Sequence, residues 1–177
     1  MSLAWLALNS VKGLGPARIK TLLDAYGSPE EVFKASASAI ARIDGIPPET
    51  ASQLKDDEIF RQAESQLALA EALGVAVLTL SHERYPALLR EIFAPPPVIF
   101  VKGDPKVFGR HAVGVVGTRH PSDYGRSATA SLCRDLVRAR VAVVSGLAAG
   151  IDTVAHQTAL DGNGQTVAVF GCGIDIV

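Results

Sequence analysis

Hydrophobic side chains in the first 72 residues recur at the spacing of three and four that is typical of helices with one buried face. Turns rich in glycine and proline interrupt this pattern at three places: residues 11–16, 26–29 and 43–49. A longer amphipathic stretch over residues 59–73 ends at Gly74, where the backbone freedom of glycine suits the end of a helix. The pattern predicts a small all-helical domain over residues 1–72.

From Val75 onward the pattern changes to short aliphatic runs that predict strands. These runs cover residues 75–80, 98–101, 112–116, 141–144 and 166–170. The last three are continuously apolar, which is typical of strands covered on both faces, and helical stretches over residues 123–140 and 150–160 separate them. This alternation predicts a parallel sheet with right-handed crossovers in an α/β domain over residues 73–177. A three-strand core is half of a doubly wound fold, so we expect this domain to be incomplete at its C-terminus.

The composition fits a folded protein with a sizeable core. Of the 177 residues, 48% are hydrophobic and 20% are charged, which excludes a disordered chain. Apolar runs stay shorter than the roughly 18 residues of a membrane helix, and the first residues lack the basic segment of a signal peptide. Cys133 and Cys172 are too few for a disulfide framework or a zinc site, so we interpret both as small apolar residues. We expect a cytoplasmic protein without membrane association or bound metal.

The distribution of charged residues along the sequence indicates more about binding partners than the net charge does. A formal net charge of −1 excludes a uniformly basic nucleic-acid-binding protein. Residues 102–140, however, carry eight basic and three acidic side chains. Such a segment can bind a polyanion locally, although a solvated helix face would give the same count.

The turn after the strand predicted at residues 141–144 is the strongest candidate for a binding site. Ser145 and Gly146 follow that strand, and Gly150 precedes the next helix. Parallel sheets bind ligands at the carboxyl ends of their strands, and amides at the start of a helix favour a phosphate, to which the hydroxyl of Ser145 would add a donor. The spacing matches neither a dinucleotide fingerprint nor a Walker A motif, so we expect no nucleotide cofactor. The alternative is a tight turn whose glycines meet only a steric need.

A second turn, over residues 117–126, also follows a predicted strand. If the two strands are neighbours, Arg119 lies over the same crevice as Ser145, and its guanidinium can hold a phosphate by two hydrogen bonds. Tyr124 can stack on a base, although a tyrosine near a helix start is more often a packing residue. The following helix carries Arg126 and further arginines, of which some are explained by a solvated outer face.

Asp152 and His156 are four residues apart and share one helix face. A catalytic interpretation would make them an orienting acid and a base. No nucleophile or metal-ligand set accompanies them, so we favour Asp152 as a helix cap and His156 as a packed or hydrogen-bonded histidine.

The first domain contains a pattern typical of a helix-hairpin-helix turn. Gly13 and Gly15 flank an apolar residue, so that backbone amides can face a DNA phosphate, with Lys12 and Arg18 nearby. Residues 43–47 look like a second, degenerate copy, in which a proline removes one donor. Helix packing without contact to DNA is an equally good explanation for this acidic domain.

In combination, these residues resemble the DNA-processing protein A family (DprA, also called Smf). The resemblance extends over nearly the whole chain. It rests on these motifs, in this order: residues 85–89 (YPALL), residues 95–104 (PPPVIFVKGD), residues 116–119 (VGTR) with Tyr124-Gly125, and residues 145–152 (SGLAAGID) with Ala155-His156 and Ala159-Leu160.

The resemblance implies a cytoplasmic bacterial protein that binds single-stranded DNA and helps to load the RecA recombinase in natural transformation. It implies a Rossmann-like domain behind a helical SAM-like or helix-hairpin-helix domain, and a homodimer formed mainly by the Rossmann-like part. It implies binding without catalysis and without a cofactor. Carried onto this chain, the DNA site comprises Gly117, Thr118, Arg119, Tyr124, Ser145, Gly146, Leu147 and Gly150, with possible accessory contacts from Lys12, Gly13, Gly15 and Arg126.

One position departs from the family, because some members have a lysine where this chain has Ala149. The competing class is a nucleotide-binding enzyme of the phosphoribohydrolase (lysine-decarboxylase-like) type, whose Pro-Gly-Gly-x-Gly-Thr signature is absent here. A third hypothesis assigns DNA binding to the helical domain alone.

Overall fold

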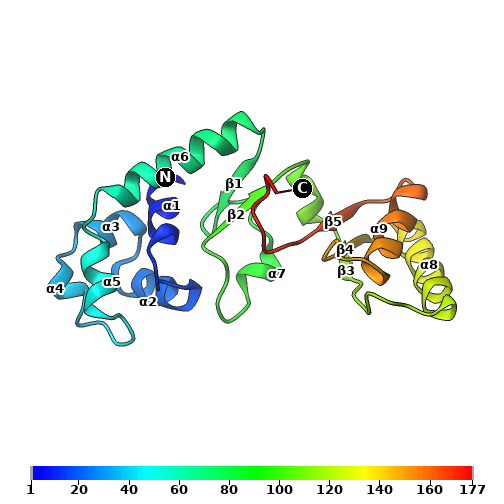
Figure 1. The fold of residues 1–177 in the computed structure, drawn as a ribbon, viewed down its shortest axis with the longest axis horizontal. Coiled ribbons are helices and arrows are strands. Elements are labelled where there is room, and N and C mark those ends of the chain that lie inside the picture. Colours follow the sequence, from blue (N-terminus) through cyan, green and yellow to red (C-terminus); the bar gives the residue numbers. More distant parts are fainter. Residues whose placement is uncertain (1, 177) are drawn as a thin grey trace. The chain divides into compact units, whose positions relative to one another are not determined.

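The computed structural model describes residues 2–176, so Met1 and Val177, the outer ends of the two predicted domains, lie outside the described residues. The chain divides into two compact units, one ending at Gly103 and the other beginning at Asp104. The helices and strands of both are labelled in Figure 1. Among the described residues, no helix has the length and apolar character needed to cross a membrane.

The first unit consists of helices and one pair of antiparallel strands. Its elements are α1 (Ser2–Ser10), α2 (Pro16–Tyr26), α3 (Pro29–Lys34), α4 (Ala37–Ile40), α5 (Pro48–Gln53), α6 (Glu58–Ala72), β1 (Ala76–Thr79), α7 (Ala87–Arg90) and β2 (Val98–Val101). Helix α3 begins where local chemistry favours a helix start, because the hydroxyl of Ser28 accepts a hydrogen bond from the amide of Glu31, and Pro29 is the first helical residue.

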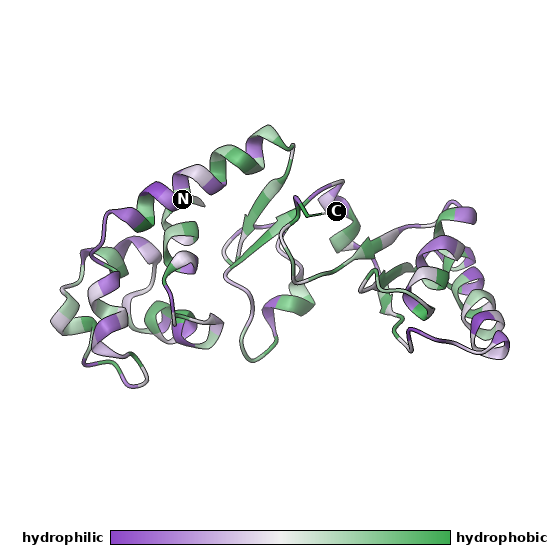
Figure 2. Cartoon of the chain, viewed as in Figure 1, coloured by the Kyte–Doolittle hydropathy of each residue, from purple (hydrophilic) through white to green (hydrophobic). Residues whose placement is uncertain are grey.

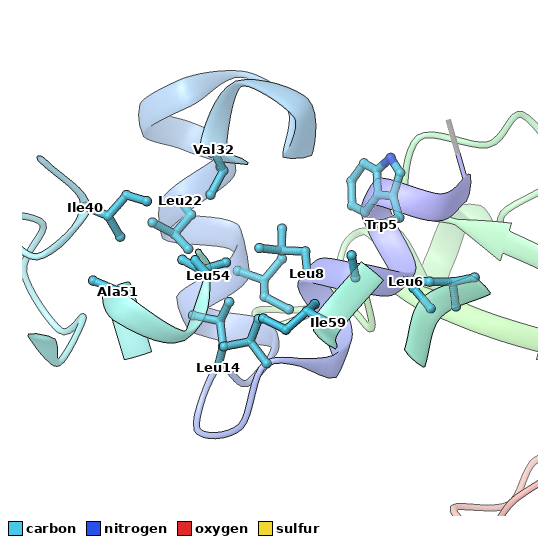
Figure 3. Close-up of a cluster of buried hydrophobic side chains, with 14 of the residues drawn as sticks. Trp5, Leu6, Leu8, Leu14, Leu22, Val32, Ile40, Ala51, Leu54 and Ile59 are labelled. Carbon is cyan, nitrogen blue, oxygen red and sulfur yellow. The ribbon is translucent and has the colours of Figure 1, made fainter. Parts of the chain in front are cut away.

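The apolar faces of these helices meet in one core. Leu6, Leu8 and Leu22 are fully buried there, and Figure 3 shows Leu8 and Leu22 among side chains from several helices. In Figure 2 the long helix α6 alternates between hydrophilic and hydrophobic segments, in keeping with one buried face. Within the described part of the chain, the first 72 residues therefore form the six helices α1 to α6.

Strands β1 and β2 belong to this first unit by their contacts. They pair only with each other, with Ala76 opposite Val101, and Val98 is buried in the same cluster as the helices. The contact-based division therefore falls after Gly103, whereas the sequence predicts it at residues 72–73, where the secondary structure changes. The strand pair is needed to cover the helical core, and a change of hydrophobic period does not reveal that requirement.

The loop after β1 is tied to the segment before β2. Tyr85 is buried, and its hydroxyl donates a hydrogen bond to the carbonyl of Pro96 over 2.8 Å. The guanidinium of Arg90 lies 5.5 Å from the centre of the Tyr85 ring. The two motifs over residues 85–89 and 95–104 are therefore packed against one another.

The second unit is a parallel sheet with two long helices. Its elements are the 3-10 helix η1 (Pro105–Gly109), β3 (Ala112–Gly114), α8 (Asp123–Arg138), β4 (Ala142–Ser145), α9 (Ile151–Asp161) and β5 (Thr166–Ala168). The strand order is β3-β4-β5, and both pairs are parallel, as predicted. Val143, Cys133 and Ala155 are fully buried between the sheet and the helices.

The expectation that all three strands are covered on both faces is wrong for β3 and also for β5, where residues 168–170 of the predicted run are exposed. All three residues of β3 are exposed, and Val116, just after it, is 76% exposed. Within the described part of the chain, α8 and α9 pack against each other and against the sheet, and a second covering layer is missing over β3. A continuous apolar run indicates that a strand can be covered on both sides, but it does not supply the covering element.

Candidate nucleic-acid interface

The carboxyl ends of β3 and β4 bring the two predicted turns together. The amide of Ile151, the first residue of α9, donates a hydrogen bond to the carbonyl of Thr118 over 3.2 Å. Gly150 has a φ of +92°, and a Cβ added there would lie 2.7 Å from the Cα and carbonyl carbon of Arg119. The backbone of the first turn therefore passes directly against Gly150, and the predicted proximity of the two turns is confirmed.

Gly117 makes a second close contact in the same place. A Cβ added at Gly117 would lie 2.6 Å from Cγ1 of Ile151. Both contacts require the absence of a side chain, so glycine at these two positions sets the distance between the turns.

Ser145 does not offer its hydroxyl to a ligand, contrary to the expectation. The side chain is only 3% exposed, and its hydroxyl donates a hydrogen bond to the carbonyl of Val115 over 2.6 Å. This bond joins the ends of β3 and β4. Ser145 therefore supports the crevice from below, because a buried backbone carbonyl needs a donor.

Asp152 holds the glycine-containing turn rather than capping its own helix. Its Oδ2 atom accepts hydrogen bonds from the amides of Gly146 (3.1 Å) and Ala148 (3.4 Å), and the residue is 6% exposed. The N-cap position of α9 is occupied by Gly150. The side chain thus serves as an internal acceptor for backbone donors, as in a cap, but the donors belong to the preceding loop.

The favoured interpretation of His156, a packed and hydrogen-bonded histidine, is confirmed. Its Nδ1 atom lies 2.6 Å from the hydroxyl of Thr166, and that hydroxyl donates to the carbonyl of Val143. Because the hydroxyl has one proton, Nδ1 must be the donor in the shorter bond. Burial lowers the pKa of His156, although the nearby Asp152 carboxylate and the Ser145 backbone act in the opposite direction.

Several amides at the crevice remain available. Those of Gly117, Arg119, Leu147 and Ala149 have no hydrogen-bond partner within the described part of the chain. Leu147 has a φ of +58° and is 59% exposed. Free amides on two adjoining turns are donors of the kind that bind an anion.

The predicted charged and aromatic residues of the first turn are on the surface. Thr118, Arg119 and Arg126 are exposed, and Tyr124 is 82% exposed at the start of α8. Neither Arg119 nor Arg126 forms an ion pair with a carboxylate of the described residues. A guanidinium without an acidic partner is available to a phosphate.

Other arginines of the basic segment lie near the amino-terminal ends of the strands, away from the two turns. Arg138 pairs with Asp135 at 3.1 Å, and Arg110 and Arg140 line a cavity of about 270 Å³ beside the last turn of α8. Cations at the C-terminal end of a helix are stabilised by its free carbonyls, which explains these positions without a ligand.

The predicted helix-hairpin-helix turn lies between α1 and α2. Lys12, Gly13 and Gly15 are exposed there, and Arg18 donates a hydrogen bond to the carbonyl of Gly13 over 2.6 Å. Gly13 has a φ of +78°, and Gly45, in the second copy, has a φ of +80°. The two copies therefore use the same glycine conformation.

Thr166 is the contributor that sequence reasoning missed. Thr166 is the first residue of β5 and lies ten residues after His156, and its hydroxyl fixes the tautomer of the His156 ring by accepting a hydrogen bond from Nδ1. A threonine at the start of a strand carries no signal of such a role, because only the register of β5 against β4 brings it there.

Two family models match the chain. One is described as DNA recombination-mediator protein A and covers residues 76–177, and the other as a SAM-like helix-hairpin-helix tandem covering residues 6–57. The tandem match agrees with the predicted second copy of the hairpin. Together the two matches and the structural comparison that follows confirm the predicted fold class, a helical domain followed by a Rossmann-like one.

Proteins and solved structures with related sequences are also found. Protein Smf from Synechocystis sp. is 35% identical over 98% of this chain and 44% of its own length. The X-ray structure of DNA processing protein A from Streptococcus pneumoniae matches 100% of this chain and 60% of that chain, with a TM-score of 0.79 and 28% identity. A Helicobacter pylori DNA processing protein A structure, described for its single-stranded DNA binding mode, matches 58% of this chain and 45% of that chain, with a TM-score of 0.52 and 29% identity. The chain thus spans less than half the length of the curated relative.

Proposed function

The chain belongs to the DNA recombination-mediator protein A family, and on that premise we propose that it binds single-stranded DNA at the paired turns after β3 and β4. The observation that carries this proposal is the close contact at Gly150, which holds two sets of free amides next to Arg119. The described DNA-binding relative supports the class of ligand.

We propose that a phosphate of the strand lies against Gly117, Arg119, Leu147 and Gly150. Gly146 and Ser145 shape the crevice, and the carbonyl of Thr118 accepts a hydrogen bond from the amide of Ile151. The exposed ring of Tyr124 offers a surface on which a base can stack. Electrostatic attraction and stacking of this kind do not depend strongly on base sequence, which suits a protein that binds any single strand.

The role of the site is binding rather than catalysis in this proposal. Asp152 and His156, an acid and a base beside the crevice, are engaged with loop amides and with Thr166. A general base needs an accessible proton acceptor, and both side chains are buried. Incubation with nucleoside monophosphates should therefore release no base, and release would favour a phosphoribohydrolase-type enzyme.

The experiment that tests the site compares two arginines. We expect Arg119→Ala to weaken binding of a labelled oligo(dT) of about 20 nucleotides by about tenfold or more, because a bond between a charged donor and a phosphate is lost. Arg134→Ala removes the same charge from an exposed position on α8 and should change affinity by less than about threefold. Equal effects of the two substitutions would contradict the proposed pocket.

The salt dependence of the same titration tests the phosphate contact. Affinity should fall steeply with salt, and Arg119→Ala should reduce the slope of log affinity against log salt by about 0.7 for a lost contact with single-stranded DNA. A salt-independent affinity would contradict an electrostatic mode of binding.

Accessory contacts are proposed at the hairpin turn and on α8. In the second unit, Arg126 would meet a further phosphate of the strand. In the first unit, Lys12 and the backbone at Gly13 and Gly15 would form a separate phosphate contact. We expect Lys12→Ala to weaken binding by a smaller factor than Arg119→Ala. A larger effect of Lys12→Ala would instead assign DNA binding to the helical domain alone.

We propose the family's wider role for the whole protein, namely a homodimer that loads the RecA recombinase on single strands in the cytoplasm during natural transformation. Sedimentation of the protein and its capture by purified RecA on oligo(dT) test the two associations. A monomer at all concentrations, or no capture, would contradict the respective proposal.

A further inference from the structure

The loop after β4 encloses a buried negative charge. Oδ2 of Asp152 accepts hydrogen bonds from the amides of Gly146 and Ala148. A Cβ added at Gly146 would lie 3.0 Å from that oxygen, so the loop closes tightly around it. The amides that alternate with these two, at Leu147 and Ala149, have no partner within the described residues. The loop therefore directs one set of amides to its own carboxylate and leaves the other set for a ligand.

No cation balances this carboxylate within the described part of the chain. Asp152 takes part in none of the ion pairs there. The basic group next to it on α9 is His156, whose Nδ1 donates to Thr166 and whose Nε2 is buried without a hydrogen-bond partner. Burial lowers the pKa of His156, which disfavours its charged form. An anion bound by the amides of Leu147 and Ala149 would therefore lie next to loop residues that hold a carboxylate without a paired cation.

We propose that Asp152 makes the crevice selective for a phosphate with one negative charge, the diester between two nucleotides, over a terminal phosphate with two. The proposal rests on the proposed function, because it concerns the anion that this site takes. Repulsion by the carboxylate doubles when the charge of the ligand doubles, and the burial of Asp152 limits its screening by water. The amides and Arg119 also attract the second charge more strongly, and in this proposal the repulsion by Asp152 offsets that gain. A fixed like charge is a common means of rejecting a competing ligand.

Such selectivity would separate a DNA strand from the free nucleotides of a cell. Nucleoside monophosphates carry close to two charges at neutral pH, since their second pKa is about 6. Phosphodiesters inside a strand carry one. The crevice would therefore bind mononucleotides less favourably than a diester, although they contain the same phosphate, sugar and base.

The test compares thymidine 5′-phosphate with its methyl ester, which carries one charge less, at about pH 8 and constant ionic strength. Binding to the intact chain is followed by the NMR shifts of the Leu147 and Ala149 amides. Asp152→Asn keeps an oxygen for both loop amides and removes the charge. We expect this variant to raise the affinity for the monophosphate relative to the ester by at least about threefold. Asp161→Asn removes the same charge from the exposed end of α9 and should leave the ratio unchanged.

Each result decides the matter. An equal change for both ligands in Asp152→Asn overturns the proposal and leaves the crevice as a phosphate site. The unmodified chain supplies a test that needs no variant, because it should bind the ester at least as tightly as the monophosphate. A clear preference for the monophosphate overturns the proposal even if Asp152→Asn does not fold. Absence of shifts at both amides with either ligand overturns the proposed phosphate pocket, and this proposal with it.

Discussion

Gly150→Ala is the substitution that most directly tests the junction of the two turns. The residue has φ +92° and ψ −123°, a conformation that is essentially open only to glycine. Holding an alanine in it costs about 1–3 kcal/mol. The new methyl group would also overlap the carbonyl of Thr118 and lie 2.7 Å from the Arg119 backbone, which has to move. Overpacking of this kind costs about 1–3 kcal/mol more.

The total, about 2–6 kcal/mol, is comparable with the whole stability of a small domain. We therefore expect Gly150→Ala to populate the open form of the second unit at least about thirtyfold more than the unmodified chain does. Gly114→Ala is the matched control, since Gly114 is an exposed residue of β3 with no atom within 4 Å of an added Cβ. The control should change stability by less than about 0.5 kcal/mol.

The thiol of Cys133 provides the assay. Cys133 is fully buried in the second unit, and its burial raises the pKa of the thiol and suppresses its reactivity. The other thiol, Cys172, is exposed and is removed by Cys172→Ser. The rate at which a thiol reagent labels Cys133 at one fixed pH then reports the population of the open form. If Gly150→Ala labels no faster than Gly114→Ala, the close approach of the two turns is refuted.

Three further outcomes are expected. Leu8→Ala should lower the unfolding free energy of the first unit by about 2–5 kcal/mol, measured by tryptophan fluorescence in urea, whereas Leu88→Ala on the surface should change it by less than about 0.5 kcal/mol. Ser145→Ala leaves a buried strand carbonyl without its donor and should destabilise the second unit by about 1–3 kcal/mol in the thiol assay, and no change relative to the exposed Ser131→Ala would count against the bond between β3 and β4. The pKa of His156 in the folded chain lies below its ordinary value of 6.5, so the unfolded chain binds more protons at mildly acidic pH. The contribution of His156 to the free energy of unfolding is therefore fully present above about pH 6.5, and it is lost as the pH falls through the lowered pKa. NMR titration of the His156 ring and urea unfolding by circular dichroism between about pH 7.5 and pH 5 measure both effects, and a ring that titrates above 6.5 would contradict the burial argument.

Features that depend on hydrophobic period and chain order could be predicted from the sequence. The three parallel strands follow from continuous apolar runs separated by helices, and their neighbour relation puts the turn at Arg119 next to the turn at Gly150. Ser28 and Pro29 mark the start of a helix by local chemistry alone. These predictions hold because each is decided within a few residues or by a simple rule of connection.

The direction of polar groups in the crevice could not be predicted in the same way. Ser145, with its hydroxyl toward Val115, and a serine with its hydroxyl toward a ligand have the same sequence context. What decides between them is the depth of the strand end below the surface, a property of the assembled sheet. The exposure of β3 depends on whether another element packs over it, and the apolar residues of β3 do not specify that element.

Asp152 shows how a correct local rule can lead to an incomplete account. A helix cap is the expectation for Asp152 when no nucleophile or metal-ligand set accompanies it, and an acid in the first turn of a helix is also favoured by the helix dipole. Gly150, however, turns the chain sharply before α9, so the first turn of the helix lies beneath the loop that precedes it. The carboxylate then meets the amides of Gly146 and Ala148 before any ligand can. A turn rich in glycine and rich in amides is therefore not necessarily a free anion site, and the number of amides open to a phosphate depends on how many the protein's own acid already holds.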